Sequence, residues 1–598
     1  MGFNMASFVV TTDTQSGQSM SAGEFGFVAA NGSILAPVGS AAVLAGTATL
    51  VSYGALAAST ASALVLNAAA STSVTIAATG SVVTSGIDLA AISGSFAGPF
   101  ALHLSGMVSG GQGINLAASK PFSTINIGND GTLQGLGFAA GHAVALTLNQ
   151  GSKAVISNTG MITTAGSGAT IKVSGQWGAT TLTNTGDIVN ASALQAAIEV
   201  TGDLALRNSG RIEGGVMVKD GVADIYNAGT LHGDVKLSGY ADTVRISGLV
   251  MGNVILGDGA NVFWQTGGRV MDTVYGGFGD DIYHLDRSDT AISDTTGGID
   301  VVYASASFRL TVGLERLVLL GPLGLVGTGN GGANGIAGDT GDDVLWGLGG
   351  NDDVNGGEGN NRMMGGGGHD TLRGGEGNDR IEGGPGADVV YVGYGNDTLW
   401  GGAGRDVLQF DALASLLGVT ANLTTNKAFF EDRGDTFRFL GFEDVVGTAY
   451  ADTLTGSALS NTLSGGGGAD RLYAAAGNDV LLGGAQGDVL DGGLGADVFV
   501  FTALSDSPLT GFDTIQGFDK LEDKIDLSAL DAIPGGADDA FTFIGTQAFG
   551  AAASCLRYQR NDAAGTTLIQ LRLTGSTSDD LQMVLSGLYD LSAASFIL

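Results

Sequence analysis

The stretch that decides the fold runs from Gly329 to Gln409 and reads GNGGANGIA GDTGDDVLW GLGGNDDVN GGEGNNRMM GGGGHDTLR GGEGNDRIE GGPGADVVY VGYGNDTLW GGAGRDVLQ. It divides without a gap into nine repeats of nine residues, each with a glycine-rich first half and an apolar eighth residue. Six more such repeats fill residues 447–500, and an isolated copy, GGFGDDIYH, stands at 276–284. Apolar residues and turns at a fixed period predict stacked parallel β-coils, with two repeats to a coil.

The sixth residue of each repeat has a side chain that can bind a metal ion. It is Asp in twelve of the fifteen repeats and Asn in three, and the isolated copy has Asp there as well. These residues are Asp343, Asp352, Asp370, Asp379, Asp388, Asp397, Asp406, Asp452, Asp470, Asp479, Asp488, Asp497, Asn334, Asn361, Asn461 and Asp281. Stacking would bring their carboxylates together, and a like-charged pair at ~4 Å costs about 4 kcal/mol at an effective dielectric of ~20. A hard cation that prefers oxygen ligands, such as Ca²⁺, relieves this repulsion, so we predict these side chains as metal ligands.

The repeats resemble the G-G-x-G-x-D-x-U-x unit of RTX, or haemolysin-type, calcium-binding proteins. The resemblance implies several Ca²⁺ ions, held by the sixth-position side chains and turn carbonyls, in a secreted or cell-surface bacterial protein. Residues 276–325 resemble the segment that precedes such repeats, and DTIQGFDKLEDKIDLSAL from Asp513 resembles the C-terminal part of serralysin-like RTX domains. The last 26 residues lack Lys and Arg and resemble an uncleaved type I secretion signal, although an acidic cap with a last strand explains them too.

A different repeat fills the N-terminal half. The motif Asn-x-Gly-x-apolar occurs at residues 129, 158, 184, 208 and 227, and the last copies settle to a period of 19 residues. This predicts one coil of a parallel β-helix per period, in which Asn side chains stack and the Asn-Gly turn needs a positive φ. The pattern resembles the β-helix of filamentous-haemagglutinin and autotransporter adhesins. We extend the solenoid over residues 1–120 because their composition is the same.

Charge divides the chain near residue 272. The whole chain has 59 Asp and Glu against 25 Lys and Arg, a net charge of −34, yet residues 1–271 hold 13 acidic and 9 basic side chains, whereas residues 272–598 hold 46 and 16. We therefore predict an all-β chain in which a parallel β-helix precedes RTX β-rolls. Its expected parts are a solenoid at 1–271, a connecting segment at 272–328, one roll at 329–409, a spacer at 410–446, a second roll at 447–500, and a serralysin-like cap with the secretion signal at 501–598.

Composition also limits the partners. Few basic residues argue against nucleic acid and anionic membrane surfaces. The uncharged stretch 41–70 is interrupted by Ser, Thr and Gly, which favours short buried strands over a membrane span. The first basic residue is Lys120, so no Sec-type signal is expected, and the single Cys555 cannot form an intrachain disulfide. The expected partners are calcium, the type I secretion machinery, and cell-surface glycans or further copies of the chain.

Catalytic motifs of the enzymes that carry RTX repeats are missing from the sequence. There is no H-E-x-x-H pair and no G-x-S-x-G elbow, which excludes a serralysin-type zinc protease and argues against a lipase. We expect a non-enzymatic surface, adhesive or matrix protein, of which a surface-layer-like array is one form. The alternative is a polysaccharide epimerase or lyase whose site lies on the N-terminal β-helix. Its acid, base and charge-neutralising groups would come from Glu199, Asp203, Arg207, Arg211, Glu213, Lys219, Asp220 and Asp224.

Overall fold

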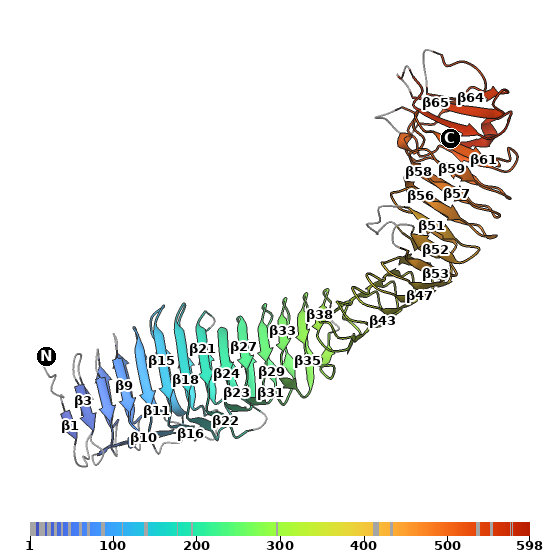
Figure 1. The fold of residues 1–598 in the computed structure, drawn as a ribbon. Coiled ribbons are helices and arrows are strands. Elements are labelled where there is room, and N and C mark those ends of the chain that lie inside the picture. Colours follow the sequence, from blue (N-terminus) through green and yellow to red (C-terminus); the bar gives the residue numbers. More distant parts are fainter. Residues whose placement is uncertain are drawn as a thin grey trace. The chain divides into compact units, whose positions relative to one another are not determined.

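The computed structural model is built almost entirely of parallel β-strands (Figure 1). It describes residues 8–598 except 11–17, 21–24, 29–32, 37–39, 46–48, 59–61, 69–71, 85–89, 111, 137–140, 176, 193–194, 295–296, 411–417, 431–433, 534–538, 551–553, 574–575 and 577. Within these residues, helix is confined to two 3-10 turns, η1 (Leu504–Asp506) and η2 (Ala593–Ser595). The all-β fold class is confirmed.

Two compact units make up the chain. The first, here the N-terminal solenoid, comprises Met1–Ser305 and Thr311–Leu314, and the second, here the C-terminal roll, comprises Ala306–Leu310 and Glu315–Leu598. The described residues contain no helix that is long and apolar enough to cross a membrane. The described residues of the uncharged stretch 41–70 instead form four short strands, as its interrupted composition predicts.

Each coil of the N-terminal solenoid contributes strands to three parallel sheets. The first sheet holds β1 (Phe8–Val10), β3 (Phe25–Val28), β6 (Thr49–Ser52), β9 (Thr72–Ile76), β12 (Phe100–Leu104), β15 (Thr124–Asn129), β18 (Lys153–Asn158), β21 (Ala179–Asn184), β24 (Asp203–Asn208), β27 (Ala223–Asn227), β30 (Thr243–Ile246), β33 (Val262–Gln265), β36 (Ile282–Leu285) and β38 (Val301–Ala304). The second sheet holds β4 (Ser33–Ala36), β7 (Ala55–Ala58), β10 (Ser81–Thr84), β13 (Met107–Gly110), β16 (Thr132–Gly135), β19 (Met161–Thr164), β22 (Asp187–Asn190), β25 (Arg211–Glu213), β28 (Thr230–His232), β31 (Leu249–Val250) and β34 (Arg269–Val270). The third sheet holds β2 (Gln18–Met20), β5 (Ala42–Ala45), β8 (Leu64–Ala68), β11 (Ala90–Phe96), β14 (Gln112–Ala118), β17 (Val144–Thr147), β20 (Ile171–Ser174), β23 (Ala196–Val200), β26 (Gly215–Val218), β29 (Val235–Lys236), β32 (Val254–Ile255), β35 (Thr273–Tyr275) and β37 (Ala291–Ser293).

The predicted 19-residue period is the coil length over β24 to β33. Leu206, Ile225, Val244 and Phe263 are register partners in successive coils, and all four are fully buried. Parallel pairing continues beyond residue 271 through β36 and β38, so the position where the charge changes lies within stacked coils.

The recurrent Asn-x-Gly motif forms the expected stack but not the expected turn. Nδ2 of Asn158 donates to Oδ1 of Asn184 at 2.7 Å, Asn184 donates in turn to Asn208, and the ladder runs from Asn129 to Asn227. The prediction of a positive φ at the glycine is wrong, since Gly186 and its equivalents do not have one. Glycine is needed there for a different reason, because a Cβ on Gly186 would lie 2.1 Å from the carbonyl oxygen of Gly160 on the preceding coil.

The C-terminal roll has two sheets whose strands repeat every 18 residues, which is two repeats to a coil. One set of strands, here called the fourth sheet within this unit, holds β40 (Arg316–Leu319), β42 (Gly335–Ala337), β44 (Asp353–Asn355), β46 (Thr371–Arg373), β48 (Val389–Tyr391), β50 (Val407–Gln409), β54 (Asp444–Val446), β56 (Thr462–Gly467), β58 (Val480–Ala485), β60 (Val498–Val500), β62 (Lys524–Asp526) and β67 (Phe596–Ile597). The fifth sheet holds β39 (Phe308–Arg309), β41 (Val326–Thr328), β43 (Val344–Gly349), β45 (Arg362–Gly367), β47 (Arg380–Pro385), β49 (Thr398–Ala403), β55 (Thr453–Thr455), β57 (Arg471–Tyr473), β59 (Val489–Asp491), β61 (Asp513–Gln516) and β66 (Leu581–Leu585).

Antiparallel strands join the two runs of repeats and cover the last coil. Between the runs, β51 (Val419–Asn422), β52 (Lys427–Phe430) and β53 (Thr436–Leu440) form an antiparallel insert whose outer strands pair in parallel with β55 and β49. Beyond the second run, β63 (Thr542–Phe543), β64 (Cys555–Asn561) and β65 (Thr566–Arg572) extend the fifth sheet next to β66. Both runs therefore belong to one continuous roll with a capped end.

Candidate metal centre

The sixth-position side chains stack in two buried columns, because alternate repeats lie above one another. All fifteen, and Asp281 in the N-terminal solenoid, are at most 5% exposed. One column contains Asn334, Asp352, Asp370, Asp388, Asp406, Asn461, Asp479 and Asp497. The other contains Asp343, Asn361, Asp379, Asp397, Asp452, Asp470 and Asp488, and it continues to Asp513 beyond the run. The structure thus places the predicted carboxylates at neighbouring positions of successive coils.

One repeated hydrogen bond builds each column. The backbone N–H of a sixth-position residue donates to Oδ1 of its counterpart in the next coil, at 2.8 Å from Asp352 to Asp370 and 2.7 Å from Asp452 to Asp470. One carboxylate oxygen is therefore occupied in fixing the register between coils. The second oxygen, Oδ2, decides what the column can bind.

Oδ2 is buried without a hydrogen-bond partner in ten of the twelve sixth-position aspartates of the described chain. Burial raises the pKa of Asp352 to about 7, and burial together with the charges of Asp488 and Asp452 raises that of Asp470 to about 8. A buried carboxylate without a counter-charge is unfavourable. Clustered carboxylate oxygens are the donor set that Ca²⁺ prefers, so these residues fit a calcium ion.

The glycine at the first position of the repeat makes room for Oδ2. A Cβ built on Gly465 would lie 2.2 Å from Oδ2 of Asp470, and the corresponding distance is 2.2–2.6 Å in the ten aspartate repeats of this kind. Any larger residue there would fill the space beside the carboxylate. Val392 and Ala474 occupy this position in two repeats, ahead of Asp397 and Asp479.

Repeats differ at their second position, and the difference determines whether Oδ2 is already satisfied. In two repeats the second-position backbone N–H donates to Oδ2, from Asp339 to Asp343 at 3.3 Å and from Thr448 to Asp452 at 2.6 Å. Asn330 and Ser457 donate in the same way to Oδ1 of Asn334 and Asn461. We call these four repeats, the first two of each run, closed repeats.

In the remaining repeats, here the open repeats, the second residue has a positive φ. The value is +97° at Gly466, and even Leu348 and Ala475 adopt +84° and +81°; Gly393 is the exception. Such values are strained for residues with a side chain. In nine of these repeats the reversed turn coincides with an aspartate Oδ2 that has no hydrogen-bond partner within the described residues; Asp397, after Gly393, has such an Oδ2 without the reversed turn, and the eleventh repeat has Asn361.

Asp281 belongs to a separate cluster in the N-terminal solenoid. Carboxylate oxygens of Asp281, Asp294 and Asp300 lie within 4.8 Å of one another, and all three residues are buried. The Tyr283 hydroxyl donates to Oδ2 of Asp294 at 2.7 Å. Burial, followed by the Asp294 charge, raises the pKa of Asp281 to about 7. Sequence reasoning found Asp281 but missed its two partners.

The columns also extend to residues that the nonapeptide pattern missed. Oδ1 of Asp513 accepts the N–H of Asp488, and Oδ1 of Asp523 accepts the N–H of Asp497, both at 2.9 Å. In the N-terminal solenoid, Oδ1 of Asp281 accepts the N–H of Asn261 in the same manner. Asp513 and Asp523 each stand two positions before a buried apolar side chain, so the short pattern Asp-x-apolar was the available signal.

The residues of the enzymatic alternative do not converge. Lys219 pairs with Glu199 at the third sheet, Arg207 pairs with Asp224 on the first, and Arg211 pairs with Glu213 on the second. Proton transfer and charge neutralisation require such groups around one substrate. The arrangement therefore does not favour a polysaccharide epimerase or lyase.

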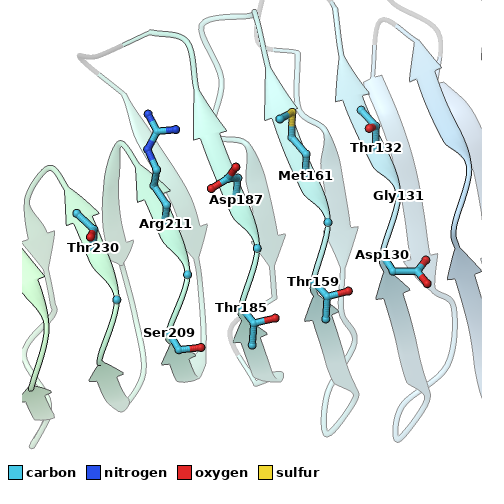
Figure 2. A pocket seen from close by; sticks show the side chains of 14 residues that line it. Asp130, Gly131, Thr132, Thr159, Met161, Thr185, Asp187, Ser209, Arg211 and Thr230 are labelled. Atoms are coloured by element: carbon cyan, nitrogen blue, oxygen red, sulfur yellow. The ribbon is translucent and has the colours of Figure 1, made fainter.

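A shallow groove of about 720 Å³ runs over the turns between the first and second sheets (Figure 2). Figure 2 shows Thr159, Thr185 and Ser209 along one side and Asp187 and Arg211 along the other. Of the eight residues proposed for catalysis, the groove contains Arg211 alone, and that side chain is paired with Glu213. The groove is a polar surface rather than an assembled acid–base site.

Comparisons with known protein families match two parts of the chain, most of the C-terminal roll and the nonapeptide copy at 276–284. Residues 342–598 match the Peptidase M10 serralysin C terminal family, and residues 271–289 match the RTX calcium-binding nonapeptide repeat. Stacked nonapeptide coils with a buried aspartate in most turns define the RTX class, and this chain belongs to it. It is an RTX protein with an N-terminal β-solenoid and a serralysin-type C-terminal domain, and RTX repeats and serralysin-type domains are typical of secreted bacterial proteins.

Two solved structures are similar to part of the chain. They are the solution structures of the AlgE6R3 and AlgE6R2 subunits of the Mannuronan C5-epimerase from Azotobacter vinelandii, each 34% identical to this chain. They cover 25% and 26% of this chain and 78% and 92% of their own, with TM-scores of 0.21 and 0.22. A comparison with curated proteins gave no match.

Proposed function

We propose that the protein leaves the cell by type I secretion, folds on calcium outside it, and serves without catalysis as a surface, adhesive or matrix component. The observation that carries the proposal is the row of buried Oδ2 atoms without a hydrogen-bond partner. When bound, Ca²⁺ supplies the positive charge that these carboxylates lack. Its binding free energy then becomes folding free energy, which keeps the roll unfolded where calcium is scarce.

Within this proposal the sixth-position residues hold the ions unequally. The open repeats with aspartate offer a free carboxylate oxygen, with turn carbonyls as further ligands, whereas the amide oxygen of Asn361 already accepts the N–H of Asp343. Asp343, Asp452, Asn334 and Asn461 belong to closed repeats and contribute less, because the second-position N–H already occupies Oδ2 of each aspartate and the one amide oxygen of each asparagine. Asp281 holds an ion together with Asp294 and Asp300. The closed repeats then serve as the first coils on which each run stacks.

Circular dichroism of the full chain tests the proposal. We expect low β content in EDTA and a cooperative gain of β signal on addition of millimolar calcium, with no comparable gain from magnesium, which demands stricter octahedral geometry. Equal β content in EDTA and in calcium would overturn it. The surface role is tested separately, by whether the calcium-folded protein remains bound to the producing cells or their matrix.

A further inference from the structure

A column of rings and guanidinium groups runs along the outer side of the first sheet of the N-terminal solenoid. Its members are register partners on consecutive coils: Arg207, Tyr226, Arg245, Trp264, His284 and Tyr303. Residues that neighbour them in the strands, such as Ile225 and Val244, point into the core, so strand alternation turns this column to solvent. Tyr226 is 38% exposed and Trp264 37%.

The rings of this column are already arranged for stacking. Trp264 and His284 have ring centroids 3.4 Å apart and planes at 10°, and His284 and Tyr303 follow at 5.0 Å and 11°. His284 lies on the coil after Trp264, and Arg245 lies on the coil before it. The ring face of Trp264 that does not stack on His284 is therefore directed towards Arg245. There a cavity of about 300 Å³ is lined by Tyr226, Arg245 and Trp264 together with Ser247.

The guanidinium groups of Arg207 and Arg245 outnumber the single carboxylate that they both contact. Nη1 of Arg245 donates to one oxygen of Asp224 at 2.9 Å, and Arg207 donates to the other. Two guanidinium groups therefore share one carboxylate, which leaves a local positive charge on a chain with a net charge of −34. Guanidinium groups recognise a second carboxylate well because their planar fork presents several N–H donors.

We propose that Tyr226, Arg245 and Trp264 form a binding site for an acidic saccharide, whose sugar ring packs on Trp264 while its carboxylate pairs with Arg245. The C–H face of a pyranose is apolar and packs well on an aromatic ring. The hydroxyl groups of the sugar would hydrogen-bond to the side chains of Ser247 and Tyr226, whose oxygens lie 3.1 Å apart. An extended chain of such sugars could lie along consecutive coils, which are spaced about 4.8 Å apart. This inference deepens the proposed surface role by naming the class of ligand.

Calorimetric titration of the full-length protein tests the site, with the hexamer of galacturonic acid as probe and the neutral hexamer of glucose as comparison. Free calcium is buffered throughout because uronates bind it. We expect the acidic hexamer to bind, and Trp264→Ala and Arg245→Gln each to weaken that binding about tenfold, in line with the loss of an aromatic or arginine anchor. Trp177→Ala is the matched control, because Trp177 is 72% exposed and lies outside the column.

Unchanged binding by both variants, or equal binding of the neutral hexamer, would overturn the proposal. Circular dichroism of the same samples separates this failure from a failure of calcium-dependent folding. A protein that gains β structure with calcium but binds the acidic hexamer without Trp264 and Arg245 contradicts only the saccharide site. A protein whose β content is the same with and without calcium contradicts the proposed function, whether or not it binds the hexamer.

Discussion

Asp470 uses its two carboxylate oxygens differently: Oδ1 accepts the backbone N–H of Asp452 on the adjoining coil at 2.7 Å, whereas Oδ2 is buried with no hydrogen-bond partner in the described chain. The first contact sets the register between coils. The second oxygen has lost its water without gaining a donor, which is unfavourable unless a cation is bound. The same side chain therefore couples the stacking of coils to metal binding.

Removal of calcium should affect the two compact units unequally. Coils around Asn158 and Asn184 are held by apolar columns and an amide ladder, whereas the coils of the roll contain the unsatisfied carboxylates. Hydrogen–deuterium exchange with mass spectrometry should show faster exchange in EDTA for peptides within 338–500 and little change for peptides within 150–232. A uniform increase along the chain would contradict this.

Open and closed repeats should respond differently to the same substitution. Asp470→Asn removes a charge from an open repeat, so we expect the protein to lose about one bound ion or most of the affinity at that turn. Asp452→Asn makes the same change where Thr448 already donates to Oδ2, and we expect the calcium content to stay the same. Elemental analysis after dialysis counts the ions, and equal losses in both variants would disprove the distinction.

Adding one methyl group beside a carboxylate should weaken the roll. Gly465→Ala would place its Cβ 2.2 Å from Oδ2 of Asp470, so we expect a higher calcium midpoint of folding and a cost of about 1–3 kcal/mol, typical of overpacking. Gly367→Ala is the control, because a Cβ there meets no atom within 4 Å and its φ is not positive. The calcium titration followed by circular dichroism compares them, and identical midpoints would show that the space beside Oδ2 is not needed.

Breaking the asparagine ladder should destabilise the N-terminal solenoid. Asn184 accepts from Asn158 and donates to Asn208, so Asn184→Ala leaves a buried amide on each side with a missing partner. We expect a loss of about 1–3 kcal/mol, the cost of unsatisfied buried polar groups. Thr183→Ala, at an exposed position of the same strand, should cost far less. Thermal unfolding in calcium measures both, and similar midpoints would rule out a stabilising ladder.

Mild acid should weaken the solenoid through His142. Burial lowers the pKa of His142, Lys172 lowers it further, and Glu199 and the carbonyl of Ala169, 2.6 Å from Nδ1, oppose the shift. The unfolded chain therefore takes up this proton at a higher pH than the folded one, and the free energy of unfolding falls as the pH drops through about 6.5. The loss in melting temperature between pH 7.5 and 5.5 should be smaller in His142→Gln, and equal losses would exclude this role.

Periodic features of the chain were predictable because they are local. The 19-residue spacing of Leu206, Ile225 and Val244 and the nonapeptide aspartates could be read from the sequence, since each coil repeats the same environment. The asparagine stack was predictable for the same reason. The positive φ expected at Gly186 was not found, because the constraint there is the carbonyl of Gly160 on another coil, which no local pattern contains.

The sequence by itself determined that this is an RTX protein of stacked β-coils with an aspartate in twelve of its fifteen nonapeptide turns. Only the tertiary structure decided which carboxylates keep an unsatisfied oxygen, that Asp294 and Asp300 join Asp281, and that the charged residues between Glu199 and Asp224 are distributed over three sheets. The physical reason is that repetition along the chain fixes what each coil looks like, whereas these hydrogen bonds and contacts depend on atoms that are distant in the sequence, 11 residues apart for Tyr283 and Asp294 and 18 for Asp452 and Asp470.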